Sequence, residues 1–478
     1  MKKALFFLIT TSLLLQACSD KSKNPNILFL MVDDLGKEWL SCYGAEEIQT
    51  PHIDQLAKSG IQFDNVYCMP QCTPTRTTLL TGQYPFRHGW VNHWDVPRWG
   101  GGVHFDETLN PSLGRYMKEA GYKTAVAGKW QINDFRVEPD VMTKHGFDEY
   151  CMWTGYEMGV DASVNRYWDL YTYEASENKT YTGEFGPDIF TQFLIDFIIE
   201  NKDTSWFIYF PMVLTHGPLV NPPGESAKSK MEKHMAMVRY TDKITGELIS
   251  ALESTEQRDN TIVFWSTDNG TSQSITGLRN GVPVRGGKAK TTENGICVPF
   301  IVSAPGMIEQ GIVSDVLVDF TDLLPTFLDF GGVPLSSLRR QGSVDFKYDG
   351  HSFKDYLLSD AKDGDRDWIL GMGGGNNARL TKNGMENMYV YRDRVLRNKE
   401  FKLYISTKKE AVKFFNLIND PWEKNNLFDR ELSEKEENNF QALLSVIKDF
   451  PDKDNDPIYN PTPAQWWDTA IKESAKKQ

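Results

Sequence analysis

Continuous apolar runs recur along the chain, and segments with apolar residues at helical spacing lie between them. The runs are rich in β-favouring residues and end in turn residues, which is typical of strands buried on both faces of a parallel sheet. We expect strands at 26–32, 123–127, 206–214, 261–265 and 298–303. We expect helices at 51–60, 72–82, 113–120, 189–201, 230–256 and 317–330. Strands that alternate with helices predict an α/β fold, with a mostly parallel sheet covered by helices on both faces.

The pattern of the chain changes near residue 371. A glycine-rich stretch there leads into short strands of alternating polarity with the spacing of hairpins, which predicts a short antiparallel sheet. These strands are expected at 388–397, 401–405 and 412–417, and a helix is expected at 433–450. The sequence therefore predicts a large α/β domain over residues 26–370 and a smaller α+β domain over residues 371–478.

The amino terminus has the composition of an export signal. Two lysines precede the apolar stretch 4–15, which is too short to span a bilayer. The stretch ends in Leu-Gln-Ala-Cys and a polar segment follows, which resembles a bacterial lipoprotein signal. We expect a signal peptide at 1–17, a lipid on Cys18 and a tether at 18–25, with a plain secretory signal as the alternative. The predicted location is on the periplasmic or cell-surface side of the outer membrane, with the lipid anchor as the only attachment to a membrane.

The charge balance restricts the classes of ligand. The 478-residue chain carries 65 Asp and Glu against 52 Lys and Arg, for a net charge of −13. Nucleic-acid binding needs a broad positive surface, so this composition speaks against a nucleic-acid partner. An anionic ligand must instead meet a local cluster of positive groups or a metal ion.

The cysteines do not form the pattern of a disulfide framework. The chain has six, and apart from the expected lipid site they are Cys42, Cys68, Cys72, Cys151 and Cys297. An odd number of cysteines in an exported protein indicates that one of them has a separate role.

Polar side chains follow several of the expected strands. They are Asp33, Asp34, Lys129, Gln131, His216, Asp268 and Asn269. Ligands of open parallel sheets bind beyond the carboxyl ends of the strands. Three carboxylates and an amide at one edge would repel one another unless they held a cation, and oxygen ligands favour Ca²⁺ or Mg²⁺. The sequence therefore predicts a metal site at this edge of the sheet.

A cysteine is expected at the amino terminus of one helix. In Cys-Thr-Pro-Thr-Arg, the proline suits the first turn of a helix that starts at Cys72 and ends at Gly82. Backbone N–H groups at a helix amino terminus favour an anion there. Arg76, one turn later, adds a permanent positive charge that suits a tetrahedral oxyanion.

This pentapeptide resembles the Cys-x-Pro-x-Arg signature of the formylglycine-dependent sulfatases, the type I, arylsulfatase-like enzymes of the alkaline-phosphatase-like superfamily. Other segments resemble parts of the same family in the same order: NILFLMVDDLG, TPHIDQLAKSGIQFDNVYC, GYKTAVAGKW, STDNG, RGGKAKTTENGICVPFIVSAPG and FFNLINDPWEKNNL. The resemblance covers nearly the whole chain after the export signal. It implies a large mixed sheet of the alkaline-phosphatase-like kind and hydrolysis of sulfate esters, with a sulfated carbohydrate as the expected substrate.

The resemblance also implies a modified residue and a metal ion. Cys72 corresponds to the cysteine that a formylglycine-generating maturation enzyme oxidises to formylglycine (3-oxoalanine). The family's metal is normally Ca²⁺, with Mg²⁺ as the less expected ion. Its ligands correspond to Asp33, Asp34, Cys72, Asp268 and Asn269.

Four further residues correspond to groups that handle the sulfate. Arg76 and Lys129 match residues that stabilise the formylglycine and its sulfate adduct, and Lys129, Lys288 and His216 match residues that bind the sulfate. Lys288 fits the family's spacing better than Lys290. A negative chain thus contains a local group of positive side chains around the expected anion site.

One departure from the family changes the expected chemistry. The family usually has Lys-Trp-His where this chain has Lys129-Trp130-Gln131. Glutamine can hydrogen-bond the hydrated formylglycine but cannot exchange a proton near neutral pH. We therefore expect His216 or Lys288 to protonate the leaving oxygen after the covalent attack on sulfur.

Two other functions remain open from the sequence. A phosphomonoester or phosphodiester hydrolase on the same scaffold would share the metal site, but would favour Ser or Thr at position 72 or more metal-binding histidines. A non-catalytic lipoprotein that binds sulfated glycans would not need Cys72, Arg76, Asp268 and Lys288 together.

Overall fold

The computed structural model describes residues 24–91, 104–110, 112–153, 166–175, 177–337, 346–359, 363–375, 378–382, 384–460 and 463. The expected signal peptide and Cys18 lie outside these residues. In the described part of the chain, the helices lack the combination of length and apolar composition needed to cross a membrane.

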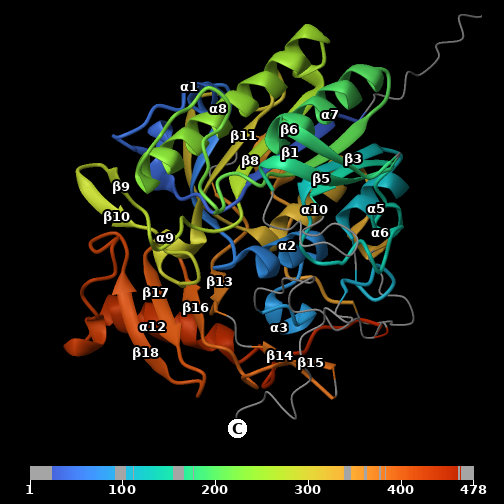
Figure 1. Ribbon diagram of the computed structural model, residues 1–478. Coiled ribbons are helices and arrows are strands. Elements are labelled where there is room, and N and C mark those ends of the chain that lie inside the picture. The colour runs from blue at the N-terminus through green and yellow to red at the C-terminus, as the bar shows by residue number, and fades with distance from the viewer. Residues whose placement is uncertain are drawn as a thin grey trace, which may run out of the picture.

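A mixed sheet runs through the centre of the molecule (Figure 1). Over the described residues it has ten strands in the order β12-β2-β11-β8-β1-β7-β3-β4-β5-β6. Their bounds are β1 (Asn26–Val32), β2 (Ile61–Tyr67), β3 (Lys123–Lys129), β4 (Glu149–Trp153), β5 (Trp168–Glu174), β6 (Lys179–Phe185), β7 (Trp206–Pro211), β8 (Thr261–Thr267), β11 (Cys297–Ser303) and β12 (Ile312–Asp319). The central strands β8, β1, β7, β3 and β4 are parallel, whereas β11, β5 and β6 pair antiparallel with their neighbours. The predicted fold class, a mixed and mostly parallel sheet, is confirmed.

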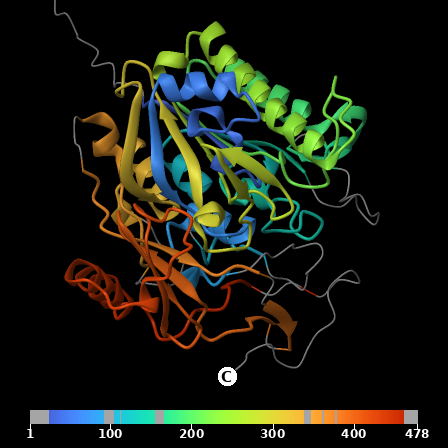
Figure 2. The same cartoon turned by 90° about the vertical axis from the view of Figure 1, so that its left-hand side faces the viewer.

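Strand β1 shows why the apolar runs of the sequence are continuous. All of its residues are buried, because helices cover both faces of the sheet (Figure 2). Alternate side chains enter two separate cores: Phe29 and Met31 pack with α2, α5 and α10, and Leu28 and Leu30 pack with α1, α7 and α8. The bounds of these helices are α1 (Pro51–Lys58), α2 (Cys72–Thr81), α5 (Leu113–Glu119), α7 (Gly186–Glu200), α8 (Lys230–Ser254) and α10 (Leu323–Phe330).

The carboxyl-terminal part of the chain forms a second, smaller sheet, drawn in orange and red in Figure 1. Its strands are antiparallel in the order β13-β16-β17-β18, and α12 packs against β17. The bounds are β13 (Ile369–Met372), β16 (Arg394–Arg397), β17 (Phe401–Ile405), β18 (Ala411–Asn416) and α12 (Glu434–Ile447). The predicted antiparallel sheet near the end of the chain is thus confirmed.

Shorter elements connect these layers. The helices are α3 (Pro85–His88), α6 (Val141–Lys144), α9 (Glu293–Ile296) and α11 (Lys354–Leu358), and the strands are β9 (Thr276–Arg279), β10 (Val282–Arg285), β14 (Ala378–Thr381) and β15 (Gly384–Asn387). The 3₁₀ turns are η1 (Lys37–Trp39), η2 (Ser41–Tyr43), η3 (Arg258–Asn260), η4 (Phe320–Asp322), η5 (Leu335–Ser337) and η6 (Leu427–Asp429).

Several expected boundaries are off by up to three residues, such as the end of the strand expected at 206–214, and two are off by more. The helix expected at 317–330 begins only at Leu323, because residues up to Asp319 complete β12 and pair with β2. Asp319 then ends the strand by accepting a hydrogen bond from the Thr321 N–H at 2.9 Å. The strand expected at 388–397 is limited to its last four residues, which pair with β13 and β17. In both places the pairing partner, rather than the local pattern, determines where the strand lies.

Gly128 allows two central strands to approach closely, next to Lys129. Its φ is +110°, and a Cβ would lie 2.2 Å from the Pro211 carbonyl oxygen. We expect Gly128→Ala to lower the free energy of unfolding by about 2–4 kcal/mol, because backbone strain and overpacking add. Gly121 is the matched control, because its φ is +88° and nothing lies within 4 Å of its Cβ position. Urea denaturation should show a loss of only about 1 kcal/mol for Gly121→Ala, and equal losses would contradict the close approach.

Candidate active site

The ends of two neighbouring strands bring the expected carboxylates together. β1 and β8 are parallel, with Val32 opposite Thr267, so the next residues, Asp33 and Asp268, emerge side by side. The Asp34 N–H donates to Asp268 Oδ1 at 3.2 Å, and the Asp268 N–H donates to the Val32 carbonyl at 2.9 Å. All three aspartates are buried. The edge of the sheet therefore carries a cluster of carboxylates that solvent hardly reaches.

Helix α2 directs Cys72 at this cluster. Cys72 is its first residue and is fully buried, with Sγ 3.4 Å from Asp33 Oδ1 and 3.8 Å from Asp34 Oδ1. The start of the helix is attached to the strand edge, because the Thr75 hydroxyl donates to the Asp268 carbonyl at 2.7 Å. The prediction of a cysteine at a helix amino terminus is confirmed.

Each carboxylate is paired with a cation. The nitrogen–oxygen distances are 2.5 Å for Lys129–Asp33, 2.6 Å for Lys288–Asp34 and 2.8 Å for Arg76–Asp268. Arg76 also donates to the Lys129 backbone carbonyl at 2.7 Å and lies 3.7 Å from Asp33. Three positive side chains thus converge on one buried point, in a chain whose overall charge is negative.

The surroundings shift the pKa values of Asp33 and Asp268 in opposite directions. Burial alone would raise the pKa of Asp33, but Lys129 and the other nearby cations hold it well below its ordinary value. Burial and the neighbouring Asp33 raise the pKa of Asp268 to about 7, although Arg76 opposes the rise. The surroundings therefore favour the ionised form of Asp33, whereas burial next to Asp33 disfavours the ionised form of Asp268.

The unmodified thiol of Cys72 is chemically quiet. Burial raises its pKa well above the ordinary value, and the charges of Asp268 and Asp33 raise it further. The thiolate is the reactive form of cysteine, so this residue is a poor nucleophile as a thiol.

His216 approaches the same point from the segment after β7. Its Nε2 lies 3.7 Å from Asp34 Oδ2. Burial lowers its pKa well below the ordinary value, and Lys288 and Arg166 contribute to the shift. The lowered pKa favours the neutral ring, and one ring nitrogen faces the carboxylates.

The carboxylate and amide oxygens of the site fit a hard cation. Ligand atoms of Asp33, Asp34, Cys72 and His216 all lie within 4.8 Å of one another. The amide of Asn269 donates to Asp34 Oδ1 at 2.8 Å, and its buried Oδ1 has no hydrogen-bond partner among the described residues. A cation such as Ca²⁺ would satisfy an orphaned carbonyl oxygen that lies beside carboxylates.

The other predicted residues lie as follows. Lys288, rather than the exposed Lys290, reaches the cluster. Gln131 is half-buried just beyond the end of β3, with a φ of +72°. Cys18, the expected lipid site, lies outside the described residues.

Arg166 and Tyr167, just before β5, also belong to the site and were missed from the sequence. The Tyr167 hydroxyl donates to the backbone carbonyls of Val213, at 2.8 Å, and of His216. Arg166 Nη1 lies 2.9 Å from Nδ1 of His216, a residue 50 positions away in the chain. No motif or spacing connects such distant segments, so only the folded chain reveals the contact.

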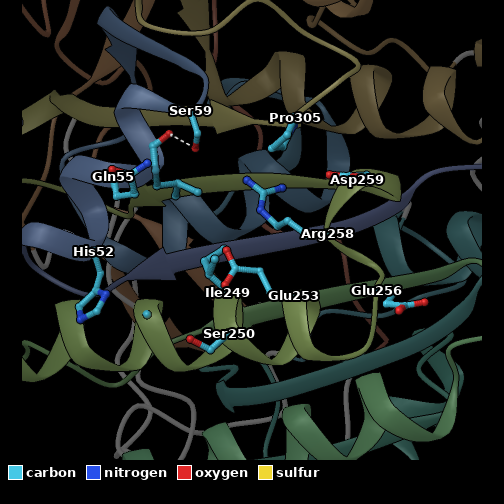
Figure 3. Close-up of a pocket in the computed structure, with 12 residues that line it drawn as sticks. His52, Gln55, Ser59, Ile249, Ser250, Glu253, Glu256, Arg258, Asp259 and Pro305 are labelled. Atoms are coloured by element: carbon cyan, nitrogen blue, oxygen red, sulfur yellow. Dashed lines mark hydrogen bonds between the residues drawn. The ribbon is translucent and has the colours of Figure 1, made fainter.

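A separate hollow lies between α1 and α8 (Figure 3). It is near the start of β8, whereas the candidate active site is at the carboxyl end of that strand. Its volume is about 670 Å³. Arg258, which precedes β8, donates to Ser303 Oγ at 2.6 Å and to the Thr261 carbonyl at 3.1 Å. None of the predicted site residues is among those that line it. This hollow is therefore distinct from the candidate active site.

Comparison with known sequences identifies relatives of the chain. Residues 25–333 match the family described as Sulfatase. Human N-acetylgalactosamine-6-sulfatase is 32% identical over 332 residues, which cover 65% of this chain and 62% of that protein. The N-acetylgalactosamine-6-O-sulfatase of Bacteroides thetaiotaomicron is 29% identical over 380 residues, which cover 62% of this chain and 72% of that protein. The match thus spans less than two thirds of the length of the human relative.

A solved structure shares the fold over nearly the whole chain. The structure described as Ps i-CgsB in complex with k-i-k-neocarrahexaose has a TM-score of 0.73 and 23% identity, and the match covers 92% of this chain and 95% of that chain. The sequence match to the family also covers more than half of the chain. The protein therefore belongs to the sulfatase family.

Proposed function

We propose that the protein is a sulfatase, a sulfuric ester hydrolase that removes sulfate from a sulfated carbohydrate. The observation that carries this proposal is Cys72 itself, buried at the start of α2 with its Sγ 3.4 Å from Asp33 Oδ1. Arg76, Lys129 and Lys288 surround this point with positive charge that suits a sulfate. Because the thiol has a raised pKa, conversion of Cys72 to formylglycine by a maturation enzyme gives the site a better nucleophile.

The residues of the chain have distinct roles in this proposal. Formylglycine, when present as its hydrate, would supply one hydroxyl that attacks sulfur and a second hydroxyl that loses its proton, so that sulfate leaves and the aldehyde is restored. Arg76, Lys129 and Lys288 bind the sulfate oxygens and neutralise their charge. His216 gives a proton to the leaving oxygen, because a bound anion favours the protonated ring. Gln131 contributes a hydrogen bond near residue 72 but no proton.

We propose that Asp33, Asp34, Asp268, Asn269 and residue 72 hold a Ca²⁺ ion, which neutralises charge on the sulfate. The orphaned Oδ1 of Asn269 supports this assignment. Removal of metal by a chelator is expected to lower the melting temperature, and Ca²⁺ should restore it more than Mg²⁺. At a concentration of 100 times Kd, a bound ion stabilises a protein by about 2.7 kcal/mol.

Scanning fluorimetry and calorimetry with Ca²⁺ alone test this site without any need for activity. Asp34→Ala is expected to remove the response to Ca²⁺. Asp259→Ala is the matched control, because Asp259 is an exposed carboxylate at the separate hollow. If both variants respond to Ca²⁺ like the parent, the assignment is wrong.

The relatives suggest the first substrate to test. Both named relatives are N-acetylgalactosamine 6-sulfatases, so we propose a 6-sulfated amino sugar as the starting point. The protein is co-expressed with a formylglycine-generating enzyme, conversion of residue 72 is verified by mass spectrometry, and sulfate release is measured from a panel of sulfated saccharides. Release of sulfate supports the proposal. Release of phosphate from phosphate esters instead would favour a phosphoester hydrolase, and binding of glycans without release would favour a non-catalytic lipoprotein.

We also propose the organisation of the whole chain. Residues 26–370 form the catalytic domain, and residues 371–478 form a subdomain that holds most of the smaller sheet. The first strand of that sheet, β13, starts at Ile369 and crosses the proposed boundary. Residues 1–17 are a signal peptide and Cys18 carries a lipid, which anchors the exported protein on the periplasmic or cell-surface side of the outer membrane. The lipoprotein-like amino terminus supports this location. Mass spectrometry of the mature amino terminus tests it, and an unmodified Cys18 would contradict it.

A further inference from the structure

Arg166 lies beside the candidate active site and stacks on an aromatic ring. The carbon of its guanidinium is 4.2 Å from the centre of the Trp153 ring, at the end of β4. Its Nη1 is 2.9 Å from Nδ1 of His216, whose Nε2 is 3.7 Å from Asp34 Oδ2. A single imidazole ring therefore separates this guanidinium from a proposed metal ligand.

The described residues leave the positive charge of Arg166 unbalanced. None of their carboxylates forms an ion pair with it, and its buried Nε has no hydrogen-bond partner among them. Arg76, Lys129 and Lys288, by contrast, each hold a carboxylate. A cation with a fixed plane that pairs with none of the described carboxylates, placed beside a substrate site, favours an anionic ligand.

The contact between Arg166 and His216 is one that a ligand can replace. Nδ1 of His216 also lies 2.7 Å from the Gly217 carbonyl oxygen. The Gly217 carbonyl can accept a hydrogen bond only when Nδ1 carries a proton. Arg166 can donate to Nδ1 only when Nδ1 carries none. Nδ1 therefore bonds to one of these two partners at a time. When Nδ1–H donates to Gly217, the guanidinium is available to another acceptor.

We propose that Arg166, held over the Trp153 ring, binds a second anionic group of the substrate, a carboxylate or a sulfate. This group lies on the sugar that carries the scissile sulfate or on its neighbour. The inference rests on the proposed sulfatase function and specifies its substrate class, glycans that carry acid groups besides the sulfate to be removed. The guanidinium offers parallel N–H donors that match either oxyanion, and the half-buried Trp153 restricts its orientation.

Binding is tested first in Cys72→Ala protein, so that no turnover is needed. One pair of probes is the disaccharide of glucuronic acid and N-acetylgalactosamine 6-sulfate, and the same disaccharide with its carboxyl group reduced to an alcohol. The second pair is N-acetylgalactosamine 4,6-disulfate and the 6-sulfate. The first pair detects recognition of a carboxylate and the second detects recognition of a sulfate.

We expect calorimetry to show that the charged member of at least one pair binds about tenfold tighter than its partner. Arg166→Gln should remove most of this difference, and Arg166→Lys should keep part of it, because lysine retains the charge but not the planar fork. Arg239→Gln is the matched control, because Arg239 is an exposed arginine that pairs with Glu225 on the surface. It should keep the full difference.

Kinetics of the converted enzyme on the same pairs separate binding from positioning. If Arg166 only orients His216, Arg166→Gln lowers kcat equally for both members of a pair and leaves KM unchanged. That kinetic result would overturn the inference. So would equal affinity of the parent protein for both members of each pair, and so would the absence of binding of either charged probe.

The two proposals also fail separately. Sulfate release without discrimination between the members of a pair would overturn the role of Arg166 and leave the sulfatase function standing. Conversely, Arg166 could give tighter binding while the converted enzyme releases no sulfate from any panel member. That outcome would leave the anion site standing and overturn the sulfatase function.

Discussion

Cys72→Ala is expected to abolish sulfate release while the protein remains folded. The loss should be on the order of 10⁴-fold or more, because the proposed nucleophile is made from this side chain and its neighbours cannot replace it. The thiol is small, so its removal from a buried position should cost only about 1 kcal/mol of unfolding free energy. Ion chromatography of released sulfate and urea denaturation measure the two effects.

Cys68→Ala is the control for the loss of a buried thiol in the same part of the fold. Cys68 is fully buried just after β2, and its Sγ lies 3.5 Å from the Ile296 carbonyl rather than beside Asp33. We expect this variant to lose a similar amount of stability and to keep its activity. Activity in Cys72→Ala protein would mean that the nucleophile is another group. If both variants were inactive, the loss of activity would reflect disturbed packing rather than the loss of the nucleophile.

Arg76→Met is expected to lower both stability and activity. Arg76 is 1% exposed and holds Asp268 at 2.8 Å, with Asp33 at 3.7 Å. Removal of one partner of a buried ion pair leaves an uncompensated charge and costs about 3–5 kcal/mol. Loss of a charge that we propose stabilises the reacting sulfate should lower kcat by a further factor of about 10²–10³.

The double variant Arg76→Met/Asp268→Asn separates these two effects. It removes the unpaired carboxylate along with the arginine, so urea denaturation should show a smaller loss of stability than for Arg76→Met alone. Sulfate release should remain low, because the positive charge is still absent and a proposed Ca²⁺ ligand, Asp268, is changed as well. If activity returned together with stability, Arg76 would have only a structural role.

Much of the site could be predicted because strand ends follow a general rule. A continuous apolar run such as 26–32 indicates a buried strand, and the polar residues directly after it must lie at one edge of the sheet. Asp33, Asp268 and His216 could be assigned to that edge without any contact being known. Cys72 and Arg76 could be placed on one helix because proline and the following residues favour a helix start.

Other features could not be predicted because they depend on contacts between distant segments. The end of β12 at Asp319 depends on its pairing with β2. The pairing of Lys288 with Asp34 joins residues 254 positions apart, and that of Lys129 with Asp33 joins residues 96 positions apart. Local patterns say that such residues are polar and near a strand end, but not which cation faces which carboxylate.

The sequence by itself determined the strand–helix order, the carboxylates at the sheet edge and the cysteine at the helix start, because each follows from the spacing of nearby residues. Only the tertiary structure decided the partners: the cation beside each carboxylate, the orphaned oxygen of Asn269, and the stacking of Arg166 on Trp153 next to His216. The physical reason is that charge balance and hydrogen bonding inside a protein depend on which distant groups share the same buried volume.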